Sequence, residues 1–281
     1  MANCVVVGGS RGIGRAVARL LGELSANVVV NGRYSDAVEE TVAAITSAGG
    51  AAVAFVGSPD NEQTATNLID TCRTEFGGLD ALINCAGIPE PAGSSILTIT
   101  PEDFQRLIDA HLGTVFHTCR VAAPLMAAQR HGAIVNTGST AALGIYGGTG
   151  YPAGKAAVHG LTLAIAAELK QSGVRANVIC PGARTRLSEG GEYIAHLRDL
   201  YARGLLDEMT LQASLEPAPP ECVAPLYAYL AGDLSTRITG QIFIAAGGFI
   251  GRFKRQVPTP LGYREAPVWT VGEIDELMGR R

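Results

Sequence analysis

Short apolar runs alternate along the chain with longer segments in which apolar residues recur every three or four positions. The runs have the length of strands, and the recurring pattern is that of helices with one buried face. Apolar strands that alternate with amphipathic helices are typical of a parallel sheet covered on both faces. We therefore predict an α/β fold, a doubly wound parallel sheet, with strands at residues 3–7, 28–31, 51–56, 79–84, 133–137, 174–180 and 241–245, and helices at 15–25, 37–47, 62–76, from 101 onward, 109–129, 151–171 and 225–231.

A glycine-rich turn lies between the first predicted strand and the first predicted helix. Glycine lets the backbone turn tightly and approach a pyrophosphate, which would rest against the N-terminus of the helix. This context favours a dinucleotide site over the alternative, a plain strand-to-helix turn. The residues predicted to form the site are Gly8, Ser10, Arg11, Gly12, Ile13 and Gly14.

The end of the second predicted strand distinguishes the two nicotinamide cofactors. An acidic residue at this place binds the ribose 2′-hydroxyl of NAD, whereas an arginine suits the 2′-phosphate of NADP. Arg33 stands at this strand end, Arg11 lies in the glycine-rich turn, and the next acid is Asp36. The sequence therefore favours NADP(H) over NAD(H), with a solvated loop charge as the alternative role for Arg33.

Ser139, Tyr151 and Lys155 are the first candidate catalytic residues. Tyr151 and Lys155 stand four residues apart in a predicted helix, a spacing that places both on one face. A free phenol has a pKa near ~10, and we expect the lysine cation to lower it toward the working range. Ser139, at the end of the fifth predicted strand, would hold the substrate oxygen that the tyrosine protonates. These three groups suit hydride exchange at a carbonyl.

Pro152 directly follows Tyr151 and bears on this geometry. Proline is accepted in the first turn of a helix, but it biases the residue before it away from helical angles. If Tyr151 lay outside the helix, tertiary contacts would have to set its distance to Lys155.

The composition excludes several classes of protein. The chain has 281 residues, is 47% hydrophobic and 17% charged, and contains 35 glycines, which fits a compact α/β protein and excludes disorder. A net charge of -4 without a basic block argues against a nucleic-acid or membrane partner, and no apolar run is long enough to span a bilayer. The histidines and cysteines form no metal-type cluster, so we predict no metal site and a reducing, cytoplasmic setting.

No break in the pattern suggests a second domain. We predict a dinucleotide-binding domain that includes the substrate pocket at residues 1–250, and a C-terminal extension at 251–281. Prolines between 258 and 267 predict an extended arm, and residues 269–278 a short final helix that Thr270 would cap. The segment 187–220 is polar and interrupted by glycines and prolines; we expect either a cover over the pocket or a plain connector.

The chain resembles the short-chain dehydrogenase/reductase family over roughly residues 2–250, because several motifs stand in the family's order. They are Gly8-x-x-x-Gly12-Ile13-Gly14, Asn84-x-Ala86-Gly87, Ser139, Tyr151-x-x-x-Lys155, Pro181-Gly182, and Ile238-Thr239-Gly240-Gln241 before Gly247-Gly248.

The resemblance implies a single-domain Rossmann-type fold and a role for each matching residue. Tyr151 would be the general acid/base, Lys155 would lower its pKa and hold the nicotinamide ribose, and Ser139 would orient the carbonyl or hydroxyl. A homotetramer or homodimer through helices 109–129 and 150–171 is also implied. Asn84, Ala86 and Gly87 would line the adenosine side of the cofactor and support the sheet, and further cofactor contacts are expected at Ser58, Pro181, Gly182 and Thr185.

The chain departs from the family pattern at three places. Val7 replaces a threonine before the first glycine, and Gly57-Ser58 replaces an acid that often meets the adenine. His111 replaces the asparagine that commonly completes a catalytic tetrad, as in the 3-hydroxyacyl-CoA dehydrogenase part of multifunctional β-oxidation enzymes. We include His111 among the catalytic candidates, because it could pass protons through water to Lys155; bracing the helix is the alternative.

These features predict an NADPH-dependent oxidoreductase that reduces a ketone, or oxidises a secondary alcohol, in a mainly apolar substrate. Two alternatives stay open: an NAD-linked 3-hydroxyacyl-thioester dehydrogenase, and a non-catalytic dinucleotide-binding scaffold or sensor. Residues expected to shape the substrate pocket are Ser94, Ser95, Leu143, Ile145 and Tyr146.

Overall fold

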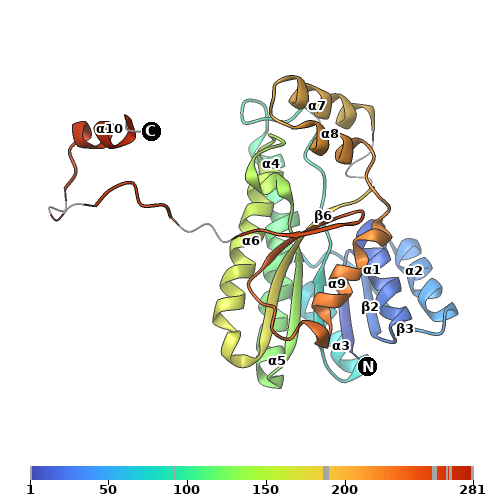
Figure 1. Cartoon of the computed structure of the whole chain (residues 1–281). Helices are drawn as coiled ribbons and strands as arrows, with labels where there is room; N and C mark the ends of the chain where they lie inside the picture. The colour runs from blue at the N-terminus through green and yellow to red at the C-terminus, as the bar shows by residue number, and fades with distance from the viewer. Residues whose placement is uncertain are drawn as a thin grey trace.

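The computed structural model describes residues 2–91, 93–185, 190–254, 258–263, 265 and 268–279. At its centre lies an eight-stranded sheet in the order β3-β2-β1-β4-β5-β6-β7-β8 (Figure 1). Neighbouring strands are parallel except β7 and β8, which are antiparallel. The predicted doubly wound α/β fold is confirmed. The strands are β1 (Asn3–Val7), β2 (Asn27–Gly32), β3 (Ala51–Val56), β4 (Ala81–Asn84), β5 (Gly132–Thr137), β6 (Val174–Gly182), β7 (Ile242–Ala246) and β8 (Phe249–Arg252).

Helices cover both faces of the sheet (Figure 1). α1, α2 and α9 pack on one face, and α3, α5 and α6 pack on the other. α4 packs against α6, and α7 and α8 pack against each other at one end of the molecule. The helices are α1 (Gly12–Glu23), α2 (Ser35–Ser47), α3 (Glu62–Phe76), α4 (Pro101–Ile108), α5 (Thr114–Gln129), α6 (Gly150–Glu168), α7 (Gly191–Ala202), α8 (Glu208–Leu215), α9 (Ala224–Ala231) and α10 (Val271–Gly279).

Successive residues of the central strands face two different cores. In β1, Cys4 and Val6 belong to the apolar cluster beneath α1, α2 and α9, whereas Val5 belongs to the cluster beneath α3, α5 and α6. The side chains of all three are almost fully buried. A strand covered on both faces needs apolar residues at every position, which explains why the strand sequences are continuous apolar runs.

Most predicted elements are present with ends within three residues of the expected ones, but one helix differs and one strand was not expected. The helix predicted at 109–129 begins only at Thr114, because Asp109–Gly113 forms a π-helical turn between α4 and α5. The unexpected strand is β8, which pairs with β7 through a turn in which Gly247 has a φ of +54°. β8 extends to Arg252 and so crosses residue 250, the boundary predicted for the extension.

The segment predicted as a cover or connector contains α7 and α8, although its residues 187–189 lie outside the described part of the chain. In the C-terminal arm, Thr270 caps α10 as predicted. Its Oγ1 accepts from the backbone N–H of Glu273 at 3.3 Å, and a carboxylate oxygen of Glu273 accepts from the Thr270 N–H at 2.8 Å. Among the described residues, no helix has the length and apolar character that crossing a bilayer requires.

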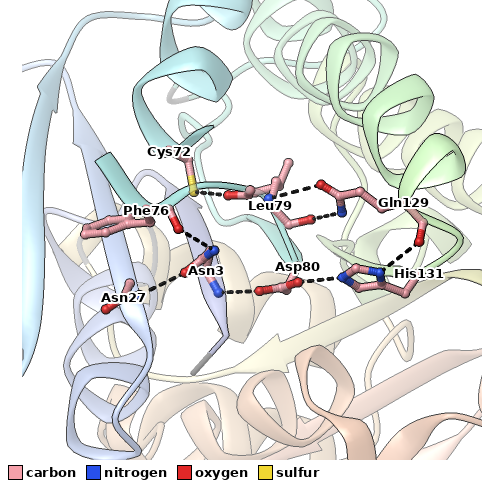
Figure 2. Close-up of polar contacts among 9 residues, drawn as sticks. Asn3, Asn27, Cys72, Phe76, Leu79, Asp80, Gln129 and His131 are labelled. Atoms are coloured by element: carbon pink, nitrogen blue, oxygen red, sulfur yellow. Dashed lines mark hydrogen bonds and ion pairs between the residues drawn. The ribbon is translucent and has the colours of Figure 1, made fainter. Parts of the chain in front are cut away.

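Polar contacts tie the amino ends of the central strands to the neighbouring chain segments (Figure 2). Asp80, just before β4, accepts from the backbone N–H of Asn3 at 2.7 Å and contacts Nε2 of His131 at 2.7 Å. At the end of α5, Nε2 of Gln129 donates to the Leu79 carbonyl at 2.9 Å. These contacts join β1, β4 and the segment that leads into β5, at the amino ends of the strands.

Candidate active site

A large cleft opens at the carboxyl ends of the strands, where the strand order reverses between β1 and β4. Ligands of open α/β sheets bind at such a switch point. The cleft holds about 2550 Å³, more than the roughly 300–1,000 Å³ of a small-molecule pocket, and so has room for a dinucleotide and a substrate. The predicted site residues that line it are Gly8, Ser10, Arg11, Gly12, Ile13, Gly14, Arg33, Ser58, Ala86, Gly87, Ser139, Tyr151, Lys155, Pro181, Gly182 and Thr185.

The glycine-rich turn forms a cradle that side chains would fill. Gly8 has a φ of +73°, and a Cβ on it would come within 2.7 Å of the backbone N of Ala86. Gly12 has a φ of +51° and opens α1, whose N-cap residue Arg11 makes no capping hydrogen bond through its side chain. The first turn of α1 carries no acid, so the leading amides and the positive end of the helix dipole suit a pyrophosphate. The residues present therefore fit a dinucleotide.

Two guanidinium groups flank one aromatic ring at the end of β2. Cζ of Arg11 lies 5.1 Å, and Cζ of Arg33 5.7 Å, from the centroid of the exposed Tyr34 ring. Stacking against an aromatic face restrains the orientation of an arginine side chain. Asp36, the first acid after β2, lies in the first turn of α2 and also lines the cleft. This end of the cleft therefore carries two guanidinium groups beside the Asp36 carboxylate. Glu40, one turn further along α2, also lines the cleft and is paired with Arg15 at 2.7 Å.

Asn84 was predicted to contact the cofactor, but its side chain does not line the cleft. It is 2% exposed, its Oδ1 accepts from Thr118 at 3.0 Å, and its Nδ2 donates to Oδ1 of Asn136 at 2.9 Å. Asn136 in turn donates to Thr162 of α6 at 2.9 Å. Asn84 thus belongs to a buried polar network that joins β4 and β5 to α5 and α6.

Tyr151 and Lys155 lie on one face of α6, in its first two turns. The helix begins at Gly150, so Tyr151 is inside it and Pro152 occupies the first turn, where a missing N–H costs little. Lys155 is 4% exposed, and its Nζ donates to the carbonyl of Thr137 at 2.9 Å. The same Nζ lies 5.8 Å from the centroid of the Tyr151 ring. The ammonium is therefore held between the end of β5 and the phenol.

Burial dominates the titration of this pair. It raises the pKa of Tyr151, and a hydrogen bond from Ser139 only partly opposes the effect. It also lowers the pKa of Lys155 to about 8. The net shift of the Tyr151 pKa is thus upward, opposite in direction to the lowering that we expected from Lys155, because desolvation of the phenolate by burial is its largest cause.

Ser139 follows the end of β5 and precedes the 3₁₀ turn Thr140–Leu143. Its Oγ accepts from the backbone N–H of Ala141 at 3.1 Å, and its own N–H donates to Nε2 of His159 at 3.4 Å. Burial lowers the pKa of His159 to about 4, so this ring is neutral and accepts at Nε2. Ser139 is thereby fixed from both sides, with its hydroxyl in reach of Tyr151.

His111 lies in the π-helical turn and is fully buried. Its Nε2 contacts the carbonyl of Ile88 at 3.0 Å, and its ring stands edge-on to Tyr151 with centroids 4.9 Å apart. Burial and the charge of Lys155 lower the pKa of His111 to about 3, so the ring is neutral and Nε2 donates to the carbonyl. Nδ1 is then an acceptor, buried without a hydrogen-bond partner among the described residues. His111 does not line the cleft itself.

α7 and α8 cover part of the cleft. Tyr193 and His196 of α7 line it, and Nε2 of His196 contacts the Tyr146 carbonyl at 2.9 Å. Among the described residues, segment 187–220 therefore forms a cover rather than a plain connector. The two helices share a small core of their own, made of Leu197, Leu200, Leu206 and Leu211 with Tyr146, Tyr193 and Leu215 against it.

The residues predicted to shape the substrate pocket divide into two groups. Ser94 and Tyr146 line the cleft. Ser95, Leu143 and Ile145 do not, and Leu143 is 55% exposed because the 3₁₀ turn after Ser139 directs it to solvent.

Glu90 is a residue at the site that the sequence pattern did not indicate. It lies in the loop between β4 and α4, lines the cleft, and accepts hydrogen bonds from the backbone N–H groups of Thr149, Gly150 and Tyr151. A contact between residues about sixty positions apart leaves no local pattern. The sequence even suggested that no outside acceptor was needed, since the N-cap residue of α6 is Thr149, a residue type that often caps helices, but the Thr149 side chain makes no capping bond.

Comparison with known proteins gives a consistent result. A family model described as short chain dehydrogenase matches residues 2–189. The chain is 34% identical over 248 residues to a 3alpha-hydroxysteroid dehydrogenase of Mediterraneibacter gnavus, covering 86% of this chain and 94% of that protein. It is 34% identical over 257 residues to the hydroxyacyl-CoA dehydrogenase ChsB1 of Mycobacterium tuberculosis, covering 86% of this chain and 76% of that protein. A crystal structure of a short chain dehydrogenase from Mycobacterium avium superposes with a TM-score of 0.81 at 32% identity, covering 98% of this chain and 94% of that one.

The Rossmann-type fold and these relatives define an NAD(P)-dependent oxidoreductase that acts on CH–OH and C=O groups. The chain belongs to the short-chain dehydrogenase/reductase family. Within that family its relatives include hydroxysteroid and hydroxyacyl-CoA dehydrogenases.

Proposed function

We propose that the protein uses NADPH to reduce a ketone, or to run the reverse oxidation of a secondary alcohol, in a mainly apolar substrate. The observation that carries this proposal is the meeting of Ser139, Tyr151 and Lys155 on one wall of the cleft. When bound, the nicotinamide supplies or accepts the hydride. The chain's own part is to orient the substrate oxygen and to move a proton to or from it.

Tyr151 is the proton donor for reduction. Burial raises the pKa of its phenol, so the group keeps its proton at neutral pH and can give it to an oxygen that gains negative charge. Lys155 is charged below its pKa of about 8 and stabilises the phenolate that this transfer leaves. The Ser139 hydroxyl donates a hydrogen bond to the same substrate oxygen and so fixes its position.

His111 is proposed to help return the proton to this group. Its Nδ1 is a buried acceptor, and a Cβ placed on Gly87 would lie 3.2 Å from that atom and 3.8 Å from Nζ of Lys155. Gly87 therefore lies close to both side chains, and this places His111 beside Lys155. That proximity supports a path for protons behind Tyr151.

NADPH is proposed as the cofactor because Arg11 and Arg33 flank Tyr34 at the end of β2. The test is fluorescence titration of the wild type and of Arg33→Ala with NADPH and with NADH. We expect tighter binding of NADPH by the wild type, a loss of about tenfold in the variant, and little change for NADH. Arg120→Ala, an exposed site on α5, is the control. A wild-type preference for NADH would overturn the cofactor proposal.

A 3-hydroxyacyl-thioester dehydrogenase that uses NAD is the second candidate function. Two observations favour it: His111 occupies the tetrad position, and a hydroxyacyl-CoA dehydrogenase is among the relatives. Assays of the purified protein with a hydroxysteroid and with a 3-hydroxyacyl-CoA, each with both cofactors, separate the two. The apolar wall contributed by Tyr146 and Tyr193 supports a hydrophobic body next to the reacting carbon in either case.

Tyr151→Phe tests the enzyme proposal against a dinucleotide-binding scaffold. Loss of the phenolic oxygen removes the proton donor, so we expect turnover to fall by about 10³-fold or more while NADPH still binds. Ser139→Ala should lower turnover by about 10²-fold, because one hydrogen bond to the reacting oxygen is lost. Unchanged turnover in Tyr151→Phe would instead favour a scaffold or sensor.

A further inference from the structure

The carboxylate of Glu90 receives four hydrogen bonds from two separate segments. Its Oε1 accepts from the backbone N–H of Thr149 at 3.1 Å, from that of Gly150 at 3.2 Å, and from the hydroxyl of Ser94 at 3.0 Å. Its Oε2 accepts from the N–H of Tyr151 at 2.6 Å. One side chain from the loop after β4 thus binds the start of the helix that carries Tyr151 and Lys155.

These bonds satisfy the amides at the N-terminus of α6. Thr149 occupies the N-cap position, but its side chain makes no capping bond, and its Oγ1 is buried without a partner among the described residues. Pro152 has no N–H, and the N–H of Ala153 already donates to the Thr149 carbonyl at 3.3 Å. The free amides ahead of that bond belong to Thr149, Gly150 and Tyr151, and Glu90 accepts from all three.

The same loop also holds His111. The carbonyl of Ile88, two residues before Glu90, accepts from Nε2 of His111. Gly148 has a φ of +80°, and a Cβ on it would lie 3.5 Å from the Glu90 carboxylate, so the chain passes close to this group just before α6. Residues 88–90 therefore connect to both His111 and Tyr151, whose rings stand edge-on to each other.

We propose that Glu90 is a positioning residue that sets the place of the Tyr151 phenol relative to the substrate oxygen. The inference rests on the proposed role of Tyr151 as proton donor. A carboxylate that bonds the Tyr151 N–H directly determines where the Cα of that residue lies, and a phenol displaced by about 1 Å transfers its proton far more slowly. Glu90 accepts from the amides up to Tyr151, and the next residue, Pro152, has no N–H that would need an acceptor.

Glu90→Gln and Glu90→Ala test this role. Glutamine keeps the shape of the side chain but turns an NH₂ group toward a backbone N–H, so we expect kcat to fall about tenfold. Alanine removes all four hydrogen bonds and should lower kcat by about 10²-fold. The dissociation constant for NADPH should stay within about twofold in both variants. Asn61→Ala is the matched control, because Asn61 caps α3 through the N–H of Thr64 and should lower the melting temperature without lowering kcat.

A double-mutant cycle with Tyr151→Phe separates positioning from simple stabilisation. If Glu90 acts through the phenol, Glu90→Gln has no further effect on the residual rate of Tyr151→Phe. An equal fold-loss in both backgrounds, or a normal kcat in Glu90→Gln, would overturn the proposal while leaving the role of Tyr151 intact. Full turnover in Tyr151→Phe alone would instead refute the proposed function. If Glu90→Ala does not fold, the isosteric Glu90→Gln variant carries the test.

Discussion

Lys155 is the residue whose charge should make ketone reduction depend on pH. Its pKa is lowered to about 8 by burial, so the ammonium is present at neutral pH and is lost above about 8. We expect kcat/KM for reduction to be level below about pH 7 and to fall as the pH rises through the pKa of Lys155. The measurement is a pH profile from about pH 6 to about pH 10, with NADPH affinity followed in parallel. A profile that stays flat to the alkaline limit would contradict this assignment.

Among single residues, those whose role depends on local spacing could be predicted from the sequence. Tyr151 and Lys155 are one helical turn apart, and the structure places both on one wall of the cleft. The hydrogen-bond partners of Asn84 could not be predicted, because Thr118 and Asn136 come from other elements. The direction of the Tyr151 pKa shift could not be predicted either, because this pKa depends on how deeply the surrounding fold buries the phenol.

At the scale of elements, the contact between His131 and Asp80 links the segment before β5 to the start of β4 (Figure 2). The hydrogen bond to Asp80 is the main reason that the pKa of His131 is raised. Such a histidine stabilises the folded state fully below its unfolded pKa of ~6.5, and this contribution disappears as the pH rises through the folded-state value. The contact should therefore stabilise the amino-terminal end of the sheet in a pH-dependent way.

Urea unfolding of the wild type and of His131→Gln at several pH values tests this contact. We expect the variant to be less stable than the wild type below about pH 6.5. The difference in the free energy of unfolding should be about 1 kcal/mol or less, because the His131 side chain is 58% exposed. At higher pH the stabilities of the two proteins should converge. Gln63→Ala, which removes an exposed pair with Asn67 on α3, should give a pH-independent difference. A stability gap for His131→Gln that widens with rising pH would contradict the sign of this effect.

Seven of the eight strands could be predicted because each is an apolar run bounded by polar or glycine residues. β8 could not be recognised as readily, since its residues Phe249 and Ile250 are exposed on an edge and resemble the start of a tail. The pair Gly247-Gly248 between two apolar runs was the available signal for a hairpin. The π-helical turn at Asp109–Gly113 has no sequence signature, because it keeps the apolar periodicity of the helices that it joins.

At the scale of the whole molecule, the C-terminal arm stands apart from the sheet and its helices (Figure 1). α10 has no buried residue, and Val271, Ile274 and Met278 are 85%, 45% and 53% exposed. Spacings of three and four place these three side chains on one face of the helix. An exposed apolar stripe on an arm that leaves its own domain is best covered by a second copy of the chain, which agrees with the dimer or tetramer implied by the family resemblance.

We predict that the arm packs on a neighbouring subunit and contributes to covering its cleft. A chain that ends at Phe253 tests this, because it keeps β8 and the bond from the Phe253 N–H to the Ile242 carbonyl at 2.9 Å. Light scattering should show a smaller or more readily dissociating assembly, and KM for the substrate should rise while NADPH affinity is retained. Ile274→Asp in the full-length chain should have the same effect if the apolar face of α10 is responsible, because a charge there would have to be desolvated on docking. Truncated protein with unchanged mass and unchanged KM would show that the arm serves neither assembly nor the cleft.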